Sequence, residues 1–135
     1  MAAILALKKS VETKIATLGL PVAYENVNFT PAADQDYLIV QFMNLQPDDP
    51  VIGRGYYRER IQVQVFVCSK LGVGTTPALT KAEEVRALFP KGFSETSGTY
   101  EIYTFETPQV KSAVKTVDRI VIPVIFDFAV GVLTL

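Results

Sequence analysis

The chain has 135 residues, which fits one domain over residues 1–135, and a domain of that size buries roughly two thirds of its unfolded surface. Its net charge of −1 and pI near 5.4 argue against broad nucleic-acid binding, which needs a clustered positive excess. The absence of histidine and the presence of a single cysteine exclude histidine-based triads and ordinary zinc sites, so we predict no catalytic residue, metal or cofactor.

The single cysteine and the apolar segments indicate the cellular compartment in which the protein is expected to fold. Cys68 cannot form an internal disulfide, so we expect a reducing compartment and a free, half-buried strand thiol. The first residues place lysines after a very short apolar run, the reverse of a secretory signal. Residues 120–133 are interrupted by Asp127 and are too short to span a bilayer as a helix. We therefore expect a soluble protein that is not exported and has no membrane partner.

The N-terminal third predicts a helix and two strands. Residues 2–18 form an amphipathic helix, because apolar side chains recur at three- and four-residue steps: Ile4, Leu7, Val11, Ile15 and Leu18. Residues 22–24 fit a short strand. Residues 37–45 are nearly apolar on both faces, which predicts a central strand covered on both sides. Residues 46–55, rich in proline, aspartate and glycine, then form a hairpin loop.

The most informative segment is 54–69, which alternates for longer than a typical strand. One parity is mostly apolar and contains Tyr57, Ile61, Val63, Val65 and Val67. The other parity is basic and amide-bearing and contains Arg54, Tyr56, Arg58, Arg60, Gln62, Gln64 and Phe66. Successive strand side chains point to opposite faces, so this pattern predicts an inner apolar face and an outer face suited to a polar partner.

The C-terminal half predicts a second helix and further strands. Thr76 and Pro77 begin a helix that Pro90 ends. Residues 92–105 form a hairpin with Gly98 at its turn, and 107–110 add a short extended run.

The last predicted strand is 118–128, in which Pro123 lacks a ladder donor and so indicates an edge strand or a bulge. The element order predicts an α+β fold: an antiparallel (mixed) sheet of about four to six strands with two helices packed on one face.

Close carboxylate pairs are the remaining candidates for catalysis. Asp34 with Asp36, and Asp48 with Asp49, could serve as acid and base in a small carboxylate-dependent hydrolase. All four lie in turn-rich segments, so solvated turn residues are the favoured interpretation.

Two other features fit contacts with proteins. Arg54, Arg58 and Arg60 project side by side and suit forked pairs with carboxylates or phosphates, although a solvated strand face that pairs with neighbouring acids explains them equally well. The uncharged end 129–135, with Val132, Leu133 and Leu135, is either a continued strand or a subunit contact, and we favour the contact.

Short motifs in chain order resemble the tail terminator, or tail completion, proteins of long-tailed bacteriophages and prophages. They are YLIVQFMN, GYYRERIQVQVFV, a glycine-bearing loop, ALTKAEEVRALFPKG, ETPQV and DRIVIPVIF. Within them the clearest matches are Tyr57 and Arg58, residues 62–66, 89–92, 108–110, and Pro123 with Val124. The resemblance covers most of the chain.

This resemblance implies an α+β virion protein, assembled in the host cytoplasm, that closes into a ring, typically a hexamer. Such a ring caps the head-proximal end of the tail tube, ends tube polymerisation and offers a surface for head joining. Its partners are further copies of itself, the tail tube protein and the head-tail joining protein, while DNA passes through without specific binding. The candidate contact residues are Arg54, Arg58, Arg60, Gln62, Gln64, Asp48, Asp49, Val132, Leu133 and Leu135.

Three rival functions stay open on sequence grounds. The first is a head completion or head-tail joining protein of similar size. The second is the hydrolase, acting through Asp34 or Asp36. The third is an adaptor that binds peptides by strand addition along the edge strand containing Pro123, although proline discourages pairing there.

Overall fold

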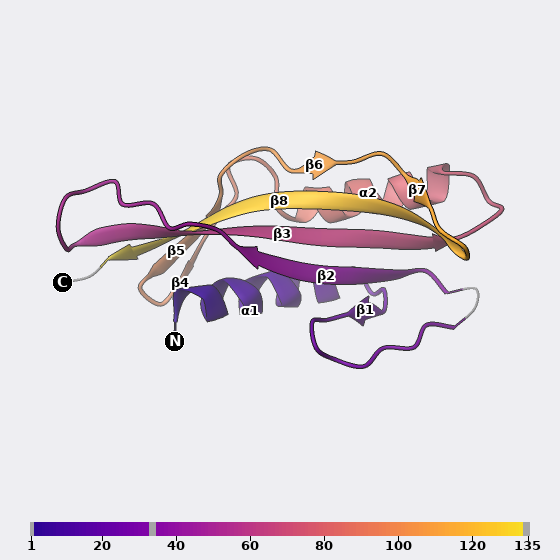
Figure 1. Cartoon of the computed structure of the whole chain (residues 1–135), viewed down its shortest axis with the longest axis horizontal. Coiled ribbons are helices and arrows are strands. Elements are labelled where there is room, and N and C mark those ends of the chain that lie inside the picture. The colour runs from indigo at the N-terminus through magenta and orange to yellow at the C-terminus, as the bar shows by residue number, and fades with distance from the viewer. Residues whose placement is uncertain (1, 33–34, 134–135) are drawn as a thin grey trace.

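The structure is a computed structural model that describes residues 2–32 and 35–133. Two helices and eight strands follow one another in these residues (Figure 1): α1 (Ala3–Ala16), β1 (Val22–Ala23), β2 (Tyr37–Asn44), β3 (Tyr56–Lys70), α2 (Thr76–Leu88), β4 (Ser94–Ser97), β5 (Tyr100–Thr104), β6 (Gln109–Val110), β7 (Val114–Lys115) and β8 (Arg119–Leu133). The α+β class is confirmed, but the described residues contain more strands than the four to six predicted.

All eight strands belong to one mixed sheet with the order β1-β2-β3-β8-β5-β4, and β6 and β7 pair with β8. Only β1 and β2 run parallel among the described pairs. The strand count was underestimated chiefly because β6 and β7 have two residues each, too few for any periodicity to show. β3 and β8 are the spine of the sheet and pair over 15 residues each, from Tyr56 opposite Leu133 to Lys70 opposite Arg119.

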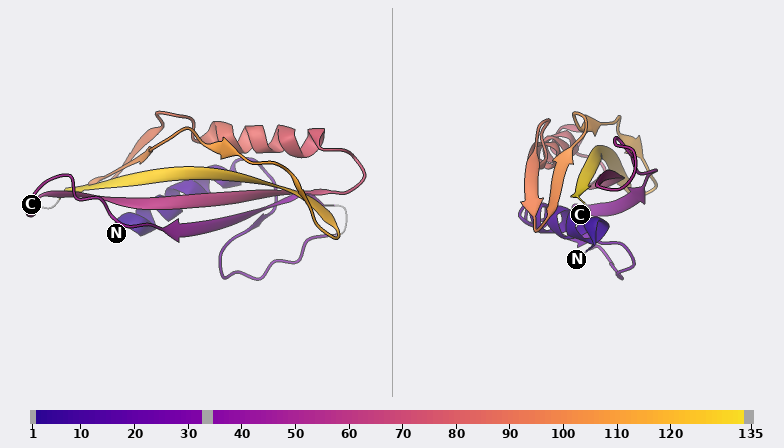
Figure 2. Two further views of the ribbon diagram at one scale, coloured as in Figure 1. Left: turned by 45° about the horizontal axis from the view of Figure 1, so that its top comes forward. Right: turned by 90° about the vertical axis from the view of Figure 1, so that its left-hand side faces the viewer.

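Both helices cover one face of the sheet, as predicted (Figure 2). The apolar stripes of α1 and α2 join the inward-facing residues of β3 in a single buried cluster, which includes Leu7, Val11, Ile15, Ala78, Ala82, Val85, Ile61, Val63, Val65 and Val67. Phe89 follows α2 and packs edge-on against Phe126 and Phe128, with ring centroids 5.4 and 5.1 Å away. The predicted inner face of the long strand is therefore confirmed as core.

The prediction that 37–45 is covered on both sides is wrong. Leu38 and Val40 of β2 are buried, whereas Gln41 and Met43 on the opposite parity are exposed. The apolar residues on both faces misled the sequence reading, because within the described residues the second face of β2 is covered only at its Tyr37 end, where Phe29 and Arg119 lie against the ring.

The prediction of an edge strand or bulge at Pro123 is also wrong. β8 lies inside the sheet, with β3 on one side and β5, β6 and β7 on the other, and its register with β3 is uninterrupted. The carbonyl oxygen of Pro123 accepts the backbone N–H of Lys111 at 2.9 Å. In an antiparallel ladder the N–H and C=O of one residue point to the same side, so the missing N–H faces the gap between β6 and β7. An interior strand tolerates proline there because the neighbouring ladder is interrupted.

Candidate functional site

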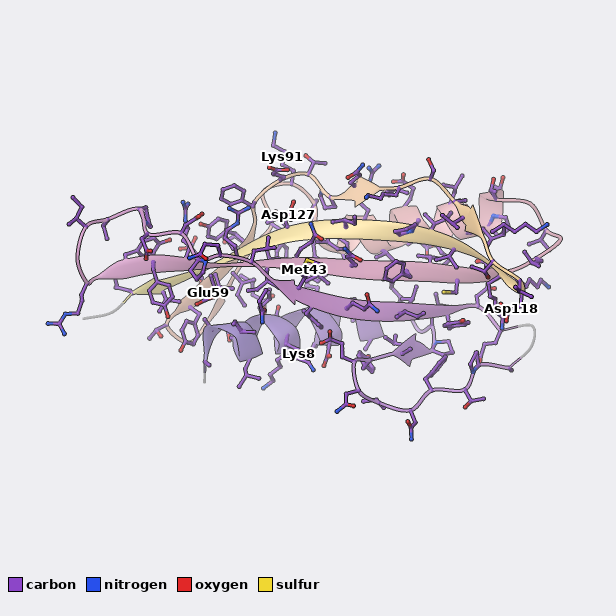
Figure 3. The ribbon with its side chains drawn as sticks, in the orientation of Figure 1. Lys8, Met43, Glu59, Lys91, Asp118 and Asp127 are labelled. Atoms are coloured by element: carbon purple, nitrogen blue, oxygen red, sulfur yellow. The ribbon has the colours of Figure 1, made fainter. Side chains whose placement is uncertain are left out.

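The sheet face opposite the helices is uncovered, and we call it the open face. It is formed by the outward parity of β2, β3 and β8: Ile39, Gln41, Met43, Arg58, Arg60, Gln62, Gln64, Phe66, Val121, Pro123, Ile125 and Asp127. Met43 and Asp127 both lie opposite Gln62 in the register, one on each neighbouring strand (Figure 3). This surface has three zones with different chemistry.

The first zone holds the two arginines of β3 around one acid. Asp48 in the loop before β3 exchanges both backbone hydrogen bonds with Arg58, at 2.9 Å each. Its carboxylate also lies 3.5 Å from the Arg58 guanidinium and 3.3 Å from that of Arg60. Two positive groups therefore share one negative group, which leaves a local charge excess of one.

Aromatic side chains complete this zone. The Phe105 ring lies beneath Arg60, with its centroid 4.0 Å from the guanidinium carbon, and Arg58 donates to the Tyr103 hydroxyl at 3.4 Å. This hydrogen bond raises the pKa of Arg58, so the side chain stays charged. Burial raises the pKa of the neighbouring Tyr56 hydroxyl. Stacked guanidiniums keep their outer donors available for a second carboxylate or phosphate.

The arginines are held rather than freely solvated. Their side chains are 27% (Arg58) and 22% (Arg60) exposed, and the Nε atoms of both are buried without a hydrogen-bond partner in the part of the chain described. Both arginines pair with the neighbouring acid Asp48, as the second sequence interpretation expects, but they are only partly exposed and are held in place.

The middle zone is polar and flat. The amide of Gln64 donates to the side-chain oxygen of Gln62 at 2.9 Å. Asp127 on β8 and Met43 on β2 flank this pair. Such a surface suits hydrogen bonding to another protein more than binding of a small molecule.

The third zone is apolar and hollowed by a cavity of about 330 Å³, with Ile39, Phe66 and Val121 in its lining. Arg119 at its rim is 4% exposed; it donates to the carbonyl oxygen of Ala32 at 2.8 Å and lies 5.3 Å from the Tyr37 ring centroid. The zone therefore joins an apolar surface to a buried cation.

Cys68 borders the same cavity and is 1% exposed, so it is fully buried and not half-buried as predicted. Tyr37 lies directly opposite it on β2, and the neighbouring rim closes over the thiol. Burial raises the pKa of the Cys68 thiol, which is expected to make it unreactive.

The other candidate contact residues lie at one end of the molecule. Asp49 and Arg54 are exposed in the loop before β3. β8 continues to Leu133, so this segment is a continued strand within the described residues, and a subunit contact there stays a prediction. Val132 is 8% exposed and belongs to the core, whereas Leu133 is 60% exposed; Leu135 lies outside the described residues.

The carboxylate candidates that the structure describes, Asp36 and Asp48, are engaged in separate contacts. The side chain of Asp36 accepts the backbone N–H of Lys70 at 3.2 Å and thereby ties the end of β3, while Asp34 lies outside the described residues. Within residues 2–32 and 35–133, no group of three or more His, Cys, Asp or Glu side chains is placed to hold a metal ion. No helix in these ranges is long and apolar enough to cross a membrane.

Sequence reasoning missed Tyr103, Phe105 and Arg119 as parts of this surface. Tyr103 and Phe105 lie in or just after the short strand β5, and their role depends on pairing with β8, which local pattern does not reveal. The one available signal for Arg119 was an arginine at the start of the last strand, directly before the apolar run that begins at Ile120.

Three comparisons with known proteins bear on this fold. Comparison with curated protein sequences gives no match. Among the matching solved structures, one superposes with a TM-score of 0.74 and 23% identity over 96% of each chain, a likeness that concerns the fold alone. A family described as "Phage tail terminator protein" matches residues 3–128. The predicted resemblance is confirmed, and the chain belongs to the phage tail terminator protein family.

Proposed function

We propose that this tail protein forms a closed ring, with six subunits, that caps the head-proximal end of the tail tube, ends tube polymerisation and supplies the surface for head joining. It acts without catalysis, as a single domain over residues 1–135, and DNA passes through its centre without specific contacts. Assembly takes place in the host cytoplasm before the ring becomes part of the virion. The family match supports the tail role, and the ring is our extension of it.

The observation that supports the proposal is the open face, which contains one basic zone and one apolar zone. A closed ring needs heterologous contacts, in which each subunit presents two different complementary patches. The open face offers a fixed basic zone at one end and an apolar hollow at the other, joined by a polar strip. One small chain thus carries several chemically distinct surfaces that its own helices leave uncovered.

We propose that the ring and tube contacts involve residues of the open face, the loop before β3 and the C-terminal end. They are Arg54, Arg58, Arg60, Gln62 and Gln64, the loop acids Asp48 and Asp49, and the C-terminal residues Val132, Leu133 and Leu135. Among the described members, Leu133 has the largest exposed apolar fraction, so at the C-terminal end it is the main candidate. Val132 contributes chiefly by holding the end of β8 in place.

Electron microscopy of the purified protein, with and without isolated tails, tests the proposal. At high concentration we expect closed rings with a central hole, and with tails we expect density at the head-proximal tube end only. A protein that stays monomeric at all concentrations and never binds tube ends would refute it. Binding to DNA-filled heads but not to tails would assign the protein to head completion instead.

A further inference from the structure

The sheet ends laterally in β1 and β4, and the part of β2 that extends beyond the two-residue β1 is also an edge. β1 pairs only with Leu38 and Ile39, so residues 40–44 of β2 have no strand beside them on that side. β4 pairs with β5 and has no neighbour on its other side among the described residues. These edges lie on opposite sides of α1 when the sheet is viewed along its length (Figure 2, right).

Backbone hydrogen bonds show which groups of β2 face outward. The N–H of Leu45 bonds to Arg60 of β3, so odd-numbered residues point inward to the ladder. Even-numbered residues point to the edge: the N–H of Leu38 reaches Pro21, and that of Phe42 reaches the Glu25 carboxylate at 3.0 Å. The N–H and C=O of Asn44 and the C=O of Phe42 therefore face outward with no partner in the described chain.

The edge of β4 is built the same way. The N–H of Thr104 bonds to the carbonyl oxygen of Phe93, which places the odd-numbered residues of this segment toward β5. The backbone groups of Ser94 and Thr96 consequently face outward, and both residues are exposed. Four residues of β4 thus form a free edge, close in length to residues 40–44 of β2, which extend beyond β1.

Apart from Glu25, which lies in the loop after β1 and accepts the Phe42 N–H, neither edge carries the usual protection against strand pairing. Monomeric proteins blunt free edges with lysine, proline, bulges or a covering loop. Residues 40–44 are Val, Gln, Phe, Met and Asn, without charge or proline, and β4 carries one charged residue, Glu95, which Ser10 of α1 holds at 2.8 Å. Beside Ile39 and Phe42, where β1 stops, a groove of about 460 Å³ remains. The backbone is left ready for another strand.

We propose that β2 of one subunit pairs with β4 of the next subunit, so that the sheet continues from subunit to subunit. This inference rests on the proposed ring. A second copy is the occupant because one chain presents two different edges of matched length, which is the condition for a heterologous contact, and because closure of the ring then leaves no edge free. In the single subunit the Phe42 N–H donates to the Glu25 carboxylate. On assembly this hydrogen bond is replaced by one to a backbone carbonyl of β4 in the next subunit.

Proline substitution tests the pairing without disturbing the subunit. Asn44→Pro and Thr96→Pro each remove an outward N–H, and neither N–H takes part in the ladder within the chain. We expect each variant to keep the wild-type circular dichroism spectrum and melting behaviour but to need at least tenfold more protein to form rings. The matched controls Asn44→Ala and Thr96→Ala retain the N–H and should assemble like the wild type.

Disulfide trapping gives a second measurement that is independent of folding losses. In a Cys68→Ser background, Met43→Cys combined with Thr96→Cys should give covalent ladders up to the ring size, because both side chains lie on the open face and the two positions lie on opposite edges of one subunit. Each single cysteine variant should give at most dimers. Rings that form normally in both proline variants, or that yield no ladder, would overturn edge pairing while leaving the proposed ring intact; loss of rings in the wild type would instead refute the proposed function.

Discussion

The two faces of β3 are made by the same fifteen residues and serve different purposes. On the inner face Ile61, Val63 and Val65 are buried beneath the helices, and substituting them is expected to lower the stability of the fold. On the outer face Arg58 and Arg60 are partly exposed beside Asp48 and Phe105. Substituting these arginines is expected to affect contacts with other proteins. Stability and assembly can therefore be altered separately in this chain, although they depend on adjacent residues of one strand.

Removing a large aromatic ring from the core should give the largest loss of stability and tests the role of the inner face. Phe89→Ala deletes the ring that packs on Phe126 and Phe128, and should lower the free energy of unfolding by about 3–5 kcal/mol. Urea denaturation followed by circular dichroism measures this. Phe105→Ala on the outer side is the matched control and should cost about 1 kcal/mol, since that ring is 40% exposed. Equal losses in both variants would contradict the division between faces.

Charge reversal at the arginines of β3 tests whether the outer face serves assembly. Arg58→Glu with Arg60→Glu should abolish rings and tail termination, while the free energy of unfolding changes by about 1 kcal/mol, because partly exposed ion pairs stabilise little. Sedimentation velocity and tail-length distributions measure assembly. Lys81→Glu with Arg86→Glu on the exposed side of α2 makes the same change in net charge away from the open face and should assemble normally. Normal tails from the β3 variant would show that the basic zone is merely solvated.

The smallest expected effect concerns Cys68, which lies on the outward parity but is buried. Its pKa is raised in the folded state by burial, so its share of stability is complete below the unfolded thiol pKa and is lost as pH rises above it. Wild type should therefore lose more stability than Cys68→Ala as pH rises above the unfolded thiol pKa of about 8.5. Parallel urea titrations of the two proteins measure the difference. Identical pH slopes would mean that the thiolate is tolerated in the fold.

The helices and the long strands were predictable because their patterns repeat. Three-and-four spacing from Leu7 to Ile15 and strict alternation from Ile61 to Val67 extend over enough residues to identify the period and the buried face. The same alternation correctly identified the arginines of β3 as an outward group.

The rest could not be predicted because it depends on pairing between distant segments. β6 and β7 exist as strands only because β8 lies beside them, and Pro123 is tolerated inside the sheet only because they leave a gap. Likewise Phe105 follows β5 in the sequence, yet it meets Arg60 because β5 and β3 both pair with β8. A single sequence gives the local period but not these neighbours.

The uninterrupted register between β3 and β8 has a consequence for how this chain can change over time. With fifteen residues paired in each strand, deleting or inserting one residue within β3 would move every following side chain to the opposite face. Valines would then meet the partner surface and glutamines the core, so folding and assembly would fail together. Length changes are therefore expected only in the segments between strands, such as 45–55 and 71–75, while the two long strands vary by substitution alone.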